Sequence, residues 1–547
     1  MANTISKPLS AFGPDFPFAY DDWLANNAGL GSIPADRQGT EVAVVGGGIG
    51  GLVAAHELMK LGLVPVVYES GRLGGRLRSQ RFGAADDVIA ELGGMRFPRS
   101  STAFFHYVDM LGLSTRPFPN PLTPAAPTTV IDLGGVPLYA ETLDDLPPLF
   151  REIAEAWDTA LNEHADFADM RAAIDSRDAN EVRRRWSALV ERWDDRTFYD
   201  FVASSRSFSE LSFRHREVFG QVGFGTGGWD SDFPNSMLEI LRVVLCGFED
   251  NQHLIVGGAE QVPRGLWSLQ VDGQSLDSLH RGAPRPGVAA IRRAGDDTID
   301  ITDRNGVSQG YSAVLIATQS WLLTTSIDVD ETLFSQDHWM ALDRTRYMQS
   351  AKTFVMVDRP FWNDRDPVTG RPPLAMTLTD RNTRGTYLFD NGPDQPAVIC
   401  LSYAWEADAA KVLTMSAHHR TRLAIETLKK IYPDTDLACH VIGEPITVSW
   451  ESDPDFLGAF KGALPGHYRY NRRMYSHFMQ DAFPSTQQGV FLAGDDVSWT
   501  PGWAEGAVQT ALNAVWGIVH HFGGSTPVTN PGPGDVWAER APVERPD

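Results

Sequence analysis

The sequence has few cysteines, and they follow no regular spacing. Among its 547 residues only Cys246, Cys400 and Cys439 are cysteine. Three cysteines so far apart provide neither a disulfide framework nor the ligand spacing of a metal site. We therefore expect a reducing compartment and no bound metal ion.

Long hydrophobic runs and an excess of positive charge are also absent. No run approaches the roughly 18 apolar residues that a membrane helix needs, and the N-terminal residues lack the basic stretch and apolar core of a secretory signal. The formal net charge of −23 disfavours binding to nucleic acid or anionic membranes through bulk electrostatics. These absences predict a soluble, cytoplasmic protein that binds neither nucleic acid nor membrane.

Residues 41–69 carry the most informative pattern. A short apolar run precedes Gly46-x-Gly48-x-x-Gly51, a helical pattern follows, and a second apolar run ends at Glu69. The first glycine permits a tight turn, the second lets the backbone approach a pyrophosphate, and the third brings helix and strand together. The acidic residue, about 20 residues further on, suits a ribose hydroxyl. The order strand, glycines, helix, strand and acid predicts a dinucleotide-binding unit.

A second glycine pair and an arginine follow. Gly74, Gly75 and Arg76 lie in the stretch SGRLGGRLRS, where a nicotinamide dehydrogenase needs no such motif. The arrangement resembles the flavin amine oxidase family, in which the glycine pair continues around the dinucleotide and the arginine approaches its phosphates. This resemblance changes the expected cofactor from NAD to FAD.

The stretch AELGGMRFP adds to the resemblance. In this family such a segment, here Gly94, Met95 and Arg96, follows the cofactor toward the isoalloxazine ring. In the amino-acid-oxidising branch the arginine lies over that ring and holds a substrate carboxylate, for which a guanidinium is the natural two-pronged partner. A structural salt bridge is the alternative role for Arg96.

A third cofactor segment is expected near the C-terminus. Gly494 and Asp495 end the stretch GVFLAGD, and Trp503 and Ala504 open the helical pattern that follows. The resemblance implies that the aspartate accepts a hydrogen bond from a ribityl hydroxyl and that the helix N-terminus faces the flavin. It also implies that the backbone of Val288 meets the adenine.

Three cofactor motifs in this order carry the resemblance over about residues 40–520. Covalent flavin attachment in some members uses a cysteine in the C-terminal motif, and no cysteine follows Cys439. We therefore expect non-covalent FAD. Lys352 matches the family lysine that holds a water near the flavin, although a lysine flanked by apolar residues also commonly reaches out to solvent.

The expected fold is α/β, α+β overall, with a segmented Rossmann-like FAD-binding domain, a mixed-sheet substrate domain and a helical insertion. The predicted parts are an N-terminal segment packed on the body (1–38), the FAD-binding domain (39–105, 246–320 and 480–525), the helical insertion (106–245), the substrate-binding domain (321–479) and a loose tail (526–547).

A scattered residue set resembles the lysine type of L-amino acid 2-monooxygenase. The expected substrate-binding residues are Arg96, Asp230, Cys246, Trp405, Phe460 and Trp503, and the expected catalytic residues are Arg96, Lys352 and Trp503. In the lysine type an aspartate, here Asp230, binds the distal amino group. The resemblance thus implies a basic substrate, L-lysine before ornithine or arginine.

The implied reaction passes the Cα hydride to flavin N5, and O2 then leads either to an amide one carbon shorter or to a 2-oxo acid and peroxide. One alternative is a 2-monooxygenase or oxidase for aromatic amino acids, in which Asp230 is structural. A second is a polyamine or monoamine oxidase, although Arg96 would then have no carboxylate to bind. A third is a flavin-binding redox carrier without turnover. We expect a homodimer, as is common among such enzymes.

Overall fold

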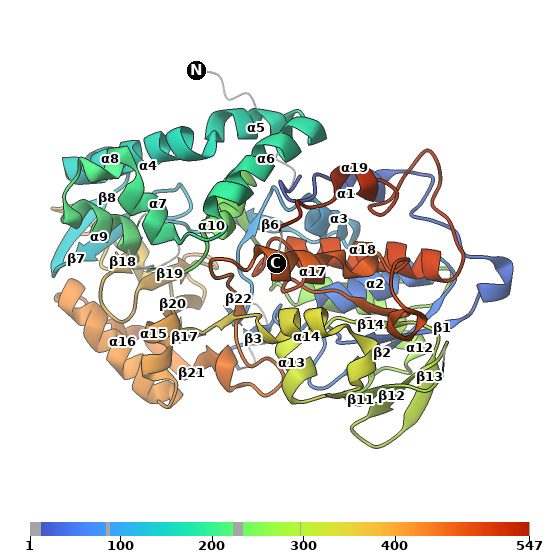
Figure 1. Ribbon diagram of the computed structural model, residues 1–547. Helices are drawn as coiled ribbons and strands as arrows, with labels where there is room; N and C mark the ends of the chain where they lie inside the picture. Colours follow the sequence, from blue (N-terminus) through green and yellow to red (C-terminus); the bar gives the residue numbers. More distant parts are fainter. Residues whose placement is uncertain (1–11, 84–87, 223–232, 296, 546–547) are drawn as a thin grey trace.

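The computed structural model describes residues 12–83, 88–222, 233–295 and 297–545. In Figure 1 sheets and helices form a layered body on the right, a second large sheet lies at the lower left, and a group of helices covers the upper left. The α/β class expected from the sequence is confirmed. No helix within the described ranges is long and apolar enough to cross a membrane.

A five-stranded parallel sheet unites segments that are far apart in the chain. Its order is β10 (Arg285–Pro286), β2 (Val64–Glu69), β1 (Glu41–Val45), β14 (Val314–Ile316) and β23 (Val490–Leu492). Successive side chains of a strand point to opposite faces. Val42 and Val44 of β1 therefore join the cluster around helix α2 (Ile49–Lys60), whereas Ala43 and Val45 belong to the cluster on the other face. Both faces are buried, as the continuous apolar run predicted.

Helices cover one face of this sheet and a smaller sheet covers the other. Helix α18 (Ala504–His521) packs beside α2, and both contribute to one hydrophobic cluster. The opposite cluster includes residues of a four-stranded sheet, β11 (Val288–Arg293), β12 (Ile299–Asp303), β13 (Ser308–Tyr311) and β15 (Asp328–Val329). A hairpin at Asn305 and Gly306 connects β12 and β13.

A seven-stranded mixed sheet forms the second large layer. Its order is β21 (Val441–Ser449), β17 (Ser350–Val357), β20 (Ala397–Trp405), β19 (Gly385–Phe389), β18 (Met376–Thr379), β7 (Thr129–Leu133) and β8 (Val136–Ala140). Val355 and Val357 pack in one cluster with helix α16 (Ala417–Ile431), and Phe354 packs in the cluster on the opposite face. Strand alternation places Lys352 on the same face as Phe354.

The helices at the upper left of Figure 1 are α4 (Pro148–Ala165), α5 (Phe167–Asp175), α6 (Ala179–Trp193) and α10 (Met237–Leu245). They lie within the helical insertion predicted over 106–245. The hairpin β7–β8 differs from the prediction that placed it in the helical insertion, because β7 pairs with β18 and extends the seven-stranded sheet. A strand's partner across more than 200 residues has no local signal in the sequence.

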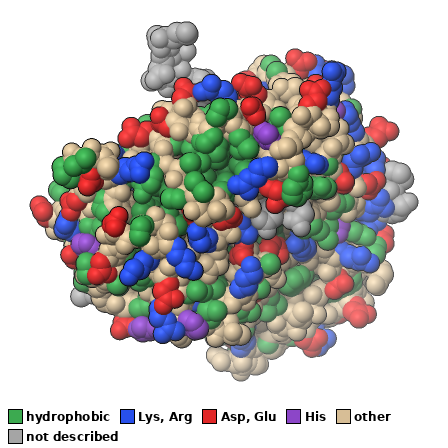
Figure 2. Space-filling model, turned by 90° about the vertical axis from the view of Figure 1, so that its left-hand side faces the viewer, with side chains coloured by type: hydrophobic (Ala, Val, Ile, Leu, Met, Phe, Trp, Pro, Cys, Tyr) green, Lys and Arg blue, Asp and Glu red, His purple; other side chains and the backbone are tan. Residues whose placement is uncertain are grey.

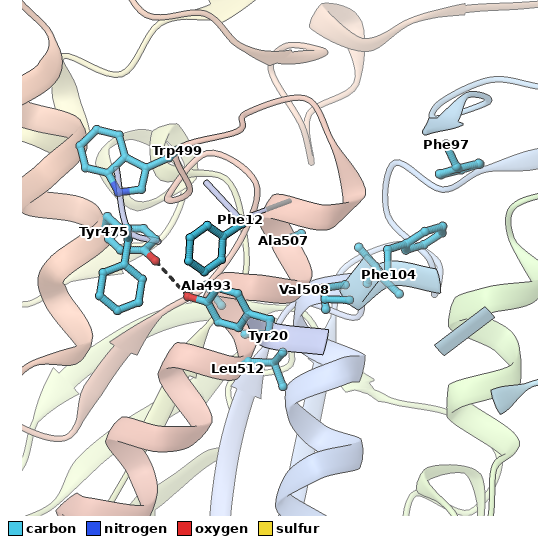
Figure 3. Close-up of a cluster of buried hydrophobic side chains, with 14 of the residues drawn as sticks. Phe12, Tyr20, Phe97, Phe104, Tyr475, Ala493, Trp499, Ala507, Val508 and Leu512 are labelled. Atoms are coloured by element: carbon cyan, nitrogen blue, oxygen red, sulfur yellow. Dashed lines mark hydrogen bonds between the residues drawn. The ribbon is translucent and has the colours of Figure 1, made fainter. Parts of the chain in front are cut away.

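Both ends of the described chain pack on the body. Phe12 and Tyr20 are buried against the C-terminal half, and the Tyr20 hydroxyl lies 2.9 Å from that of Tyr475 (Figure 3). The described part of the N-terminal segment, from residue 12 onward, therefore packs on the body. The tail, expected to be loose, is not: Asn530 is buried and its amide donates to the carbonyls of Trp23 and Gly29 at 3.1 and 2.8 Å. A Pro/Gly-rich composition fails to predict packing when a single buried amide and aromatic neighbours anchor the segment.

The surface carries charges of both signs despite the large negative total. On the face shown in Figure 2, Lys and Arg side chains lie among Asp and Glu side chains, and hydrophobic side chains gather in its upper part. No single basic patch dominates this face.

Candidate active site

The three predicted cofactor motifs converge on one cavity of about 300 Å³. It lies beyond the carboxyl ends of β1, β14 and β23, where residues following these strands line it together with residues of the seven-stranded sheet. The predicted residues in its lining are Gly46, Gly48, Glu69, Gly75, Arg76, Gly94, Met95, Arg96, Val288, Lys352, Trp405, Phe460, Gly494, Asp495, Trp503 and Ala504. Ligands of open parallel sheets bind at this edge.

Two predicted residues are not part of that lining, and a third cannot be placed. Gly51 lies one turn inside α2, and a Cβ there would come 2.0 Å from the carbonyl oxygen of Gly46, so its role is close packing of helix and strand. Cys246 is fully buried at the end of α10 and packs against Trp503 from outside the cavity. Asp230 lies outside the described residues.

The turn between β1 and α2 leaves room for a negatively charged group. Gly48 is the N-cap of α2, and a Cβ built on it would meet nothing within 4 Å. The helix N-terminus thus faces open cavity, where its N–H groups and dipole favour an anion such as a pyrophosphate. Glu69 accepts hydrogen bonds from the N–H groups of Gly47 and Gly71, both at 2.8 Å, and burial raises its pKa. This turn fits a dinucleotide.

Arg76 and Asp495 form an ion pair that joins the first and last cofactor motifs. Nη1 of Arg76 also donates to the carbonyl of Ala459 at 2.9 Å, and Asp495 accepts from the N–H of Gly502 at 3.0 Å. Arg76 was expected at the phosphates and Asp495 at a hydroxyl. Each therefore has a partner within the protein, and both border the cavity. Their roles toward a cofactor stay predictions.

Lys352 is buried rather than extended into solvent, with 3% of its surface exposed. Its Nζ donates to the carbonyls of Glu91 and Gly93 at 3.1 and 2.6 Å and lies 4.8 Å from the centre of the Tyr403 ring. Burial lowers the pKa of the amine to about 8. The lysine therefore supports the backbone segment that leads to Arg96, and it also lines the cavity.

Arg96 is a cation of the cavity wall, and its side chain is hydrogen-bonded to that of Tyr403. It stands between the rings of Phe118 and Tyr403, at 5.6 and 5.7 Å from their centres. Nη1 is buried without a hydrogen-bond partner, and the guanidinium forms no salt bridge with a described residue. A structural salt bridge therefore does not account for it. A buried guanidinium with an open donor is suited to bind a carboxylate from a ligand.

Aromatic side chains form the walls beside this cation. The ring of Trp405 lies 5.4 Å from that of Phe460, nearly perpendicular to it, and 5.5 Å from that of Tyr403. Trp503 packs against Phe248 at 5.0 Å. Burial raises the pKa of Cys246 behind Trp503 to about 12, so its thiol is protonated and inert at neutral pH. The walls exclude water and offer flat apolar surface.

The sequence reasoning missed the charged residues of α10 and of the turn after it. Glu239, Arg242 and Glu249 all line the cavity. Burial raises the pKa of Glu249, and the charge of Arg96 opposes this rise. Charged residues on the buried face of α10 carry no periodic signal. Glu249 followed by Asp250 is typical of a solvated turn.

Comparisons with known proteins all match flavin-dependent enzymes that oxidise amines or amino acids. Residues 49–519 match the model of the family described as flavin containing amine oxidoreductase. The tryptophan 2-monooxygenase of Pseudomonas savastanoi is 31% identical over 92% of this chain and 93% of that protein. That of Agrobacterium vitis is 30% identical over 97% and 72%. A flavin-dependent L-tryptophan oxidase of Lentzea aerocolonigenes is 27% identical over 87% and 98%.

Solved structures share the fold at lower identity. Cyclohexylamine oxidase from Brevibacterium oxydans superposes with a TM-score of 0.66 at 18% identity, covering 88% of this chain and 99% of that one. Wild-type putrescine oxidase bound to putrescine gives 0.63 at 15% identity, with the same coverage. At these identities the likeness concerns the fold alone.

Proposed function

This chain belongs to the flavin-containing amine oxidoreductase family, and on that premise we propose that it is an FAD-dependent 2-monooxygenase of aromatic L-amino acids, with L-tryptophan as the first candidate. The relatives at about 30% identity over nearly the whole chain are named tryptophan 2-monooxygenases. They favour the aromatic alternative over the L-lysine expectation. Asp230, on which the basic-substrate hypothesis depended, is outside the described ranges, so the described residues do not test that role.

The observation that carries the proposal is the open donor of Arg96. An amine without a carboxylate would leave this buried cation unpaired, which costs free energy. The carboxylate of an amino acid satisfies it through two parallel hydrogen bonds. Trp405 and Phe460 then offer flat apolar surface to an indole or phenyl side chain, and such ring pairs contribute about 0.5–1.5 kcal/mol beyond the area that they bury.

The residues around the cavity also suit FAD. The open N-terminus of α2 and Glu69 would hold the pyrophosphate and the adenosine ribose, and Val288 lies beside the expected adenine site. We propose that the cofactor is held non-covalently. When bound, FAD would accept the hydride of the substrate Cα, and the reduced cofactor would then react with O2. The protein fixes the carboxylate with Arg96, supports that arginine's backbone through Lys352, and excludes water with Trp503 and Phe460.

The test is product analysis with purified enzyme, O2 and L-tryptophan, L-phenylalanine or L-lysine as substrate. Mass spectrometry is expected to detect the amide one carbon shorter than the aromatic substrate. We expect kcat/KM for L-lysine to be at least about 100-fold lower, because its charged chain end would have to leave water for the apolar aromatic surface of Trp405 and Phe460. A preference for L-lysine, or an absence of turnover with every amino acid, would refute the proposal. Acid precipitation should release the flavin into the supernatant.

A further inference from the structure

A second cavity adjoins the active site at Glu249. This outer cavity, about 1430 Å³, is lined by the proline-rich stretch 116–128, by residues of α4 and α5, and by the turn 247–254. Among the described residues Glu249 is the one that lines both cavities. Its carboxylate therefore stands at the junction between the outer cavity and the space in front of Arg96.

Glu249 and Arg96 face the same space without pairing. Each shifts the pKa of the other, which shows that their charges interact, yet the two side chains form no salt bridge. The carboxylate of Glu249 accepts no hydrogen bond from a described residue. Phe118, whose ring lies under Arg96, also lines the outer cavity, so the arginine too is close to the junction. An anion and a cation are thus held apart with open space beside them.

An α-amino acid presents the complementary pair of charges on adjacent groups. Its carboxylate would satisfy the open Nη1 of Arg96, and its ammonium group would then need an acceptor on the neighbouring wall. A buried charge is stable only when it is paired. Arg96 and Glu249 do not neutralise each other. A zwitterion bound between them would pair its carboxylate with Arg96 and its ammonium group with Glu249, and no charge would be left unpaired.

We propose that Glu249 binds the α-ammonium group of the substrate, so that Arg96 and Glu249 together select a zwitterion over a simple carboxylate or a simple amine. The inference rests on the proposed amino acid substrate and assigns the group that recognises the second half of it. Glu249 acts here by binding and orienting the substrate; no bond is made or broken in this step.

The surroundings of Glu249 include several other charged or titratable groups. They are Arg96 on the segment after β4 (Ile89–Glu91), Tyr387 on β19, Asp250 beside it in the turn, and, across the outer cavity, Arg116, Asp158 and Arg171. Burial raises the pKa of Glu249, Asp250 raises it further, and Arg96 lowers it. The carboxylate must be ionised to bind an ammonium group. Affinity for ammonium-bearing ligands should therefore weaken as the pH falls through the raised pKa of Glu249.

The experiment compares two ligands that share an indole side chain. Indole-3-propanoate carries a carboxylate alone, whereas α-methyl-L-tryptophan carries carboxylate and ammonium but no Cα hydrogen to be oxidised. Their dissociation constants for the FAD-loaded enzyme are measured by calorimetry and by the change in the flavin absorption band. The KM of L-tryptophan and the inhibition constant of indole-3-propanoate give a second, kinetic readout of the same difference.

Glu249→Gln keeps the shape of the side chain and removes its charge. We expect it to weaken the ammonium-bearing ligand about tenfold or more, as loss of one charge-assisted hydrogen bond predicts, and to leave indole-3-propanoate within about twofold of wild type. The pH dependence of α-methyl-L-tryptophan binding on the acid side should flatten. Asp250→Asn, which neutralises the exposed neighbour, is the matched control and should change neither ligand.

Three outcomes are decisive. Selective loss of the ammonium-bearing ligand, with melting temperature and flavin spectrum unchanged, supports the assignment. Equal weakening of both ligands, or no change in either, overturns it. If the wild-type enzyme bound neither ligand and did not oxidise L-tryptophan, the proposed substrate class itself would fail, and that result is distinct from a failure confined to Glu249.

Discussion

At the scale of single residues, the environment of Arg96 determines what the site can bind. A guanidinium stays protonated at any physiological pH, so burial cannot be relieved by loss of its proton. Two aromatic rings stabilise its faces, but ring faces do not accept the hydrogen bonds of its edge. The unpartnered Nη1 therefore points to a ligand oxygen as the missing acceptor.

Substitution of Arg96 tests this role. Arg96→Ala should lower kcat/KM for every amino acid substrate by about 100-fold or more, since loss of a buried charge-assisted contact costs about 2–5 kcal/mol. Arg96→Lys keeps the charge but loses the two-pronged geometry, and we expect an intermediate loss. Steady-state kinetics with L-tryptophan and the flavin content of each variant are the measurements. A variant that retains wild-type kcat/KM with full flavin content would contradict the carboxylate role.

Local motifs could be predicted from the sequence, and contacts between distant residues could not. The glycines and Arg96 belong to continuous stretches whose spacing has a physical meaning, and the structure brings them to one cavity. The pairing of Arg76 with Asp495 joins residues more than 400 positions apart. Glu249 is identified as a candidate site residue by its place in the lining of both cavities, which the sequence does not indicate. Contacts between residues far apart in the sequence depend on the assembled fold, and no periodic pattern in the sequence predicts them.

At the scale of elements, helix α10 carries part of the cavity wall and is tied to the N-terminal segment. Nε and Nη2 of Arg242 donate to the carboxylate of Asp15 at 2.6 and 2.9 Å, and Trp186 Nε1 donates to the same carboxylate at 2.8 Å. Both charged side chains are almost fully buried, and Arg242 also lines the cavity. The N-terminal segment therefore helps to hold a wall of the active site.

Asp15→Ala should destabilise the protein by about 3–5 kcal/mol, because it leaves the buried charge of Arg242 without a partner. Chemical unfolding measures this loss. We expect KM for the amino acid to rise as well, since α10 loses its anchor. Asp21→Ala, on the same segment but paired at a more exposed ion pair with Arg177, is the control and should cost less than about 1 kcal/mol. Equal costs for the two variants would contradict the argument.

Helices α3 (Thr102–Met110) and α18 are joined by one carboxylate. Glu505 of α18 accepts from the N–H groups of Ala103 and Phe104 at 3.3 and 2.7 Å, so it satisfies free donors in the first turn of α3. Burial raises the pKa of Glu505 to about 7. Between its ordinary value of 4.5 and about 7 the folded state binds more protons than the unfolded chain. The contribution of Glu505 to stability is thus complete below the lower value and is lost as the pH rises through the upper one.

Glu505→Gln should remove this dependence. The unfolding free energy of the wild-type protein is expected to fall, relative to that of the variant, by roughly 2–4 kcal/mol between pH values of about 4.5 and 7.5. Denaturant unfolding of both proteins across this range measures the difference. Glu91, whose pKa burial also raises to about 7, titrates equally in both proteins and cancels. Parallel stability curves would show that Glu505 does not titrate in this range.

At the scale of the whole molecule, the two ends of the described chain pack against each other. They form one layer over helices α17 (Tyr468–Tyr475) and α18. Trp537 of the tail lies 5.4 Å from Phe16 of the N-terminal segment and 5.3 Å from Phe478. The fold class was predictable because strands, helices and glycine turns have local periods. The packing of the tail against the N-terminal segment was not predictable, because a Gly- and Pro-rich sequence is equally compatible with a loose tail.

Removal of residues 526–547 should therefore lower the melting temperature, by about 2–5 °C if the loss is a few kcal/mol. The deletion uncovers Trp516, against which Gly532 and Gly534 pack closely. It also removes the hydrogen bonds that the Asn530 side chain donates to the N-terminal segment. Because that segment holds Arg242 through Asp15, we also expect weaker substrate binding in the truncated enzyme. Asn530→Ala is the milder companion variant and should lose about 1–3 kcal/mol, because it leaves the carbonyls of Trp23 and Gly29 without this donor. Differential scanning fluorimetry and KM for L-tryptophan are the measurements, and a truncated enzyme with wild-type values for both would show that the tail only covers the surface and does not support the site.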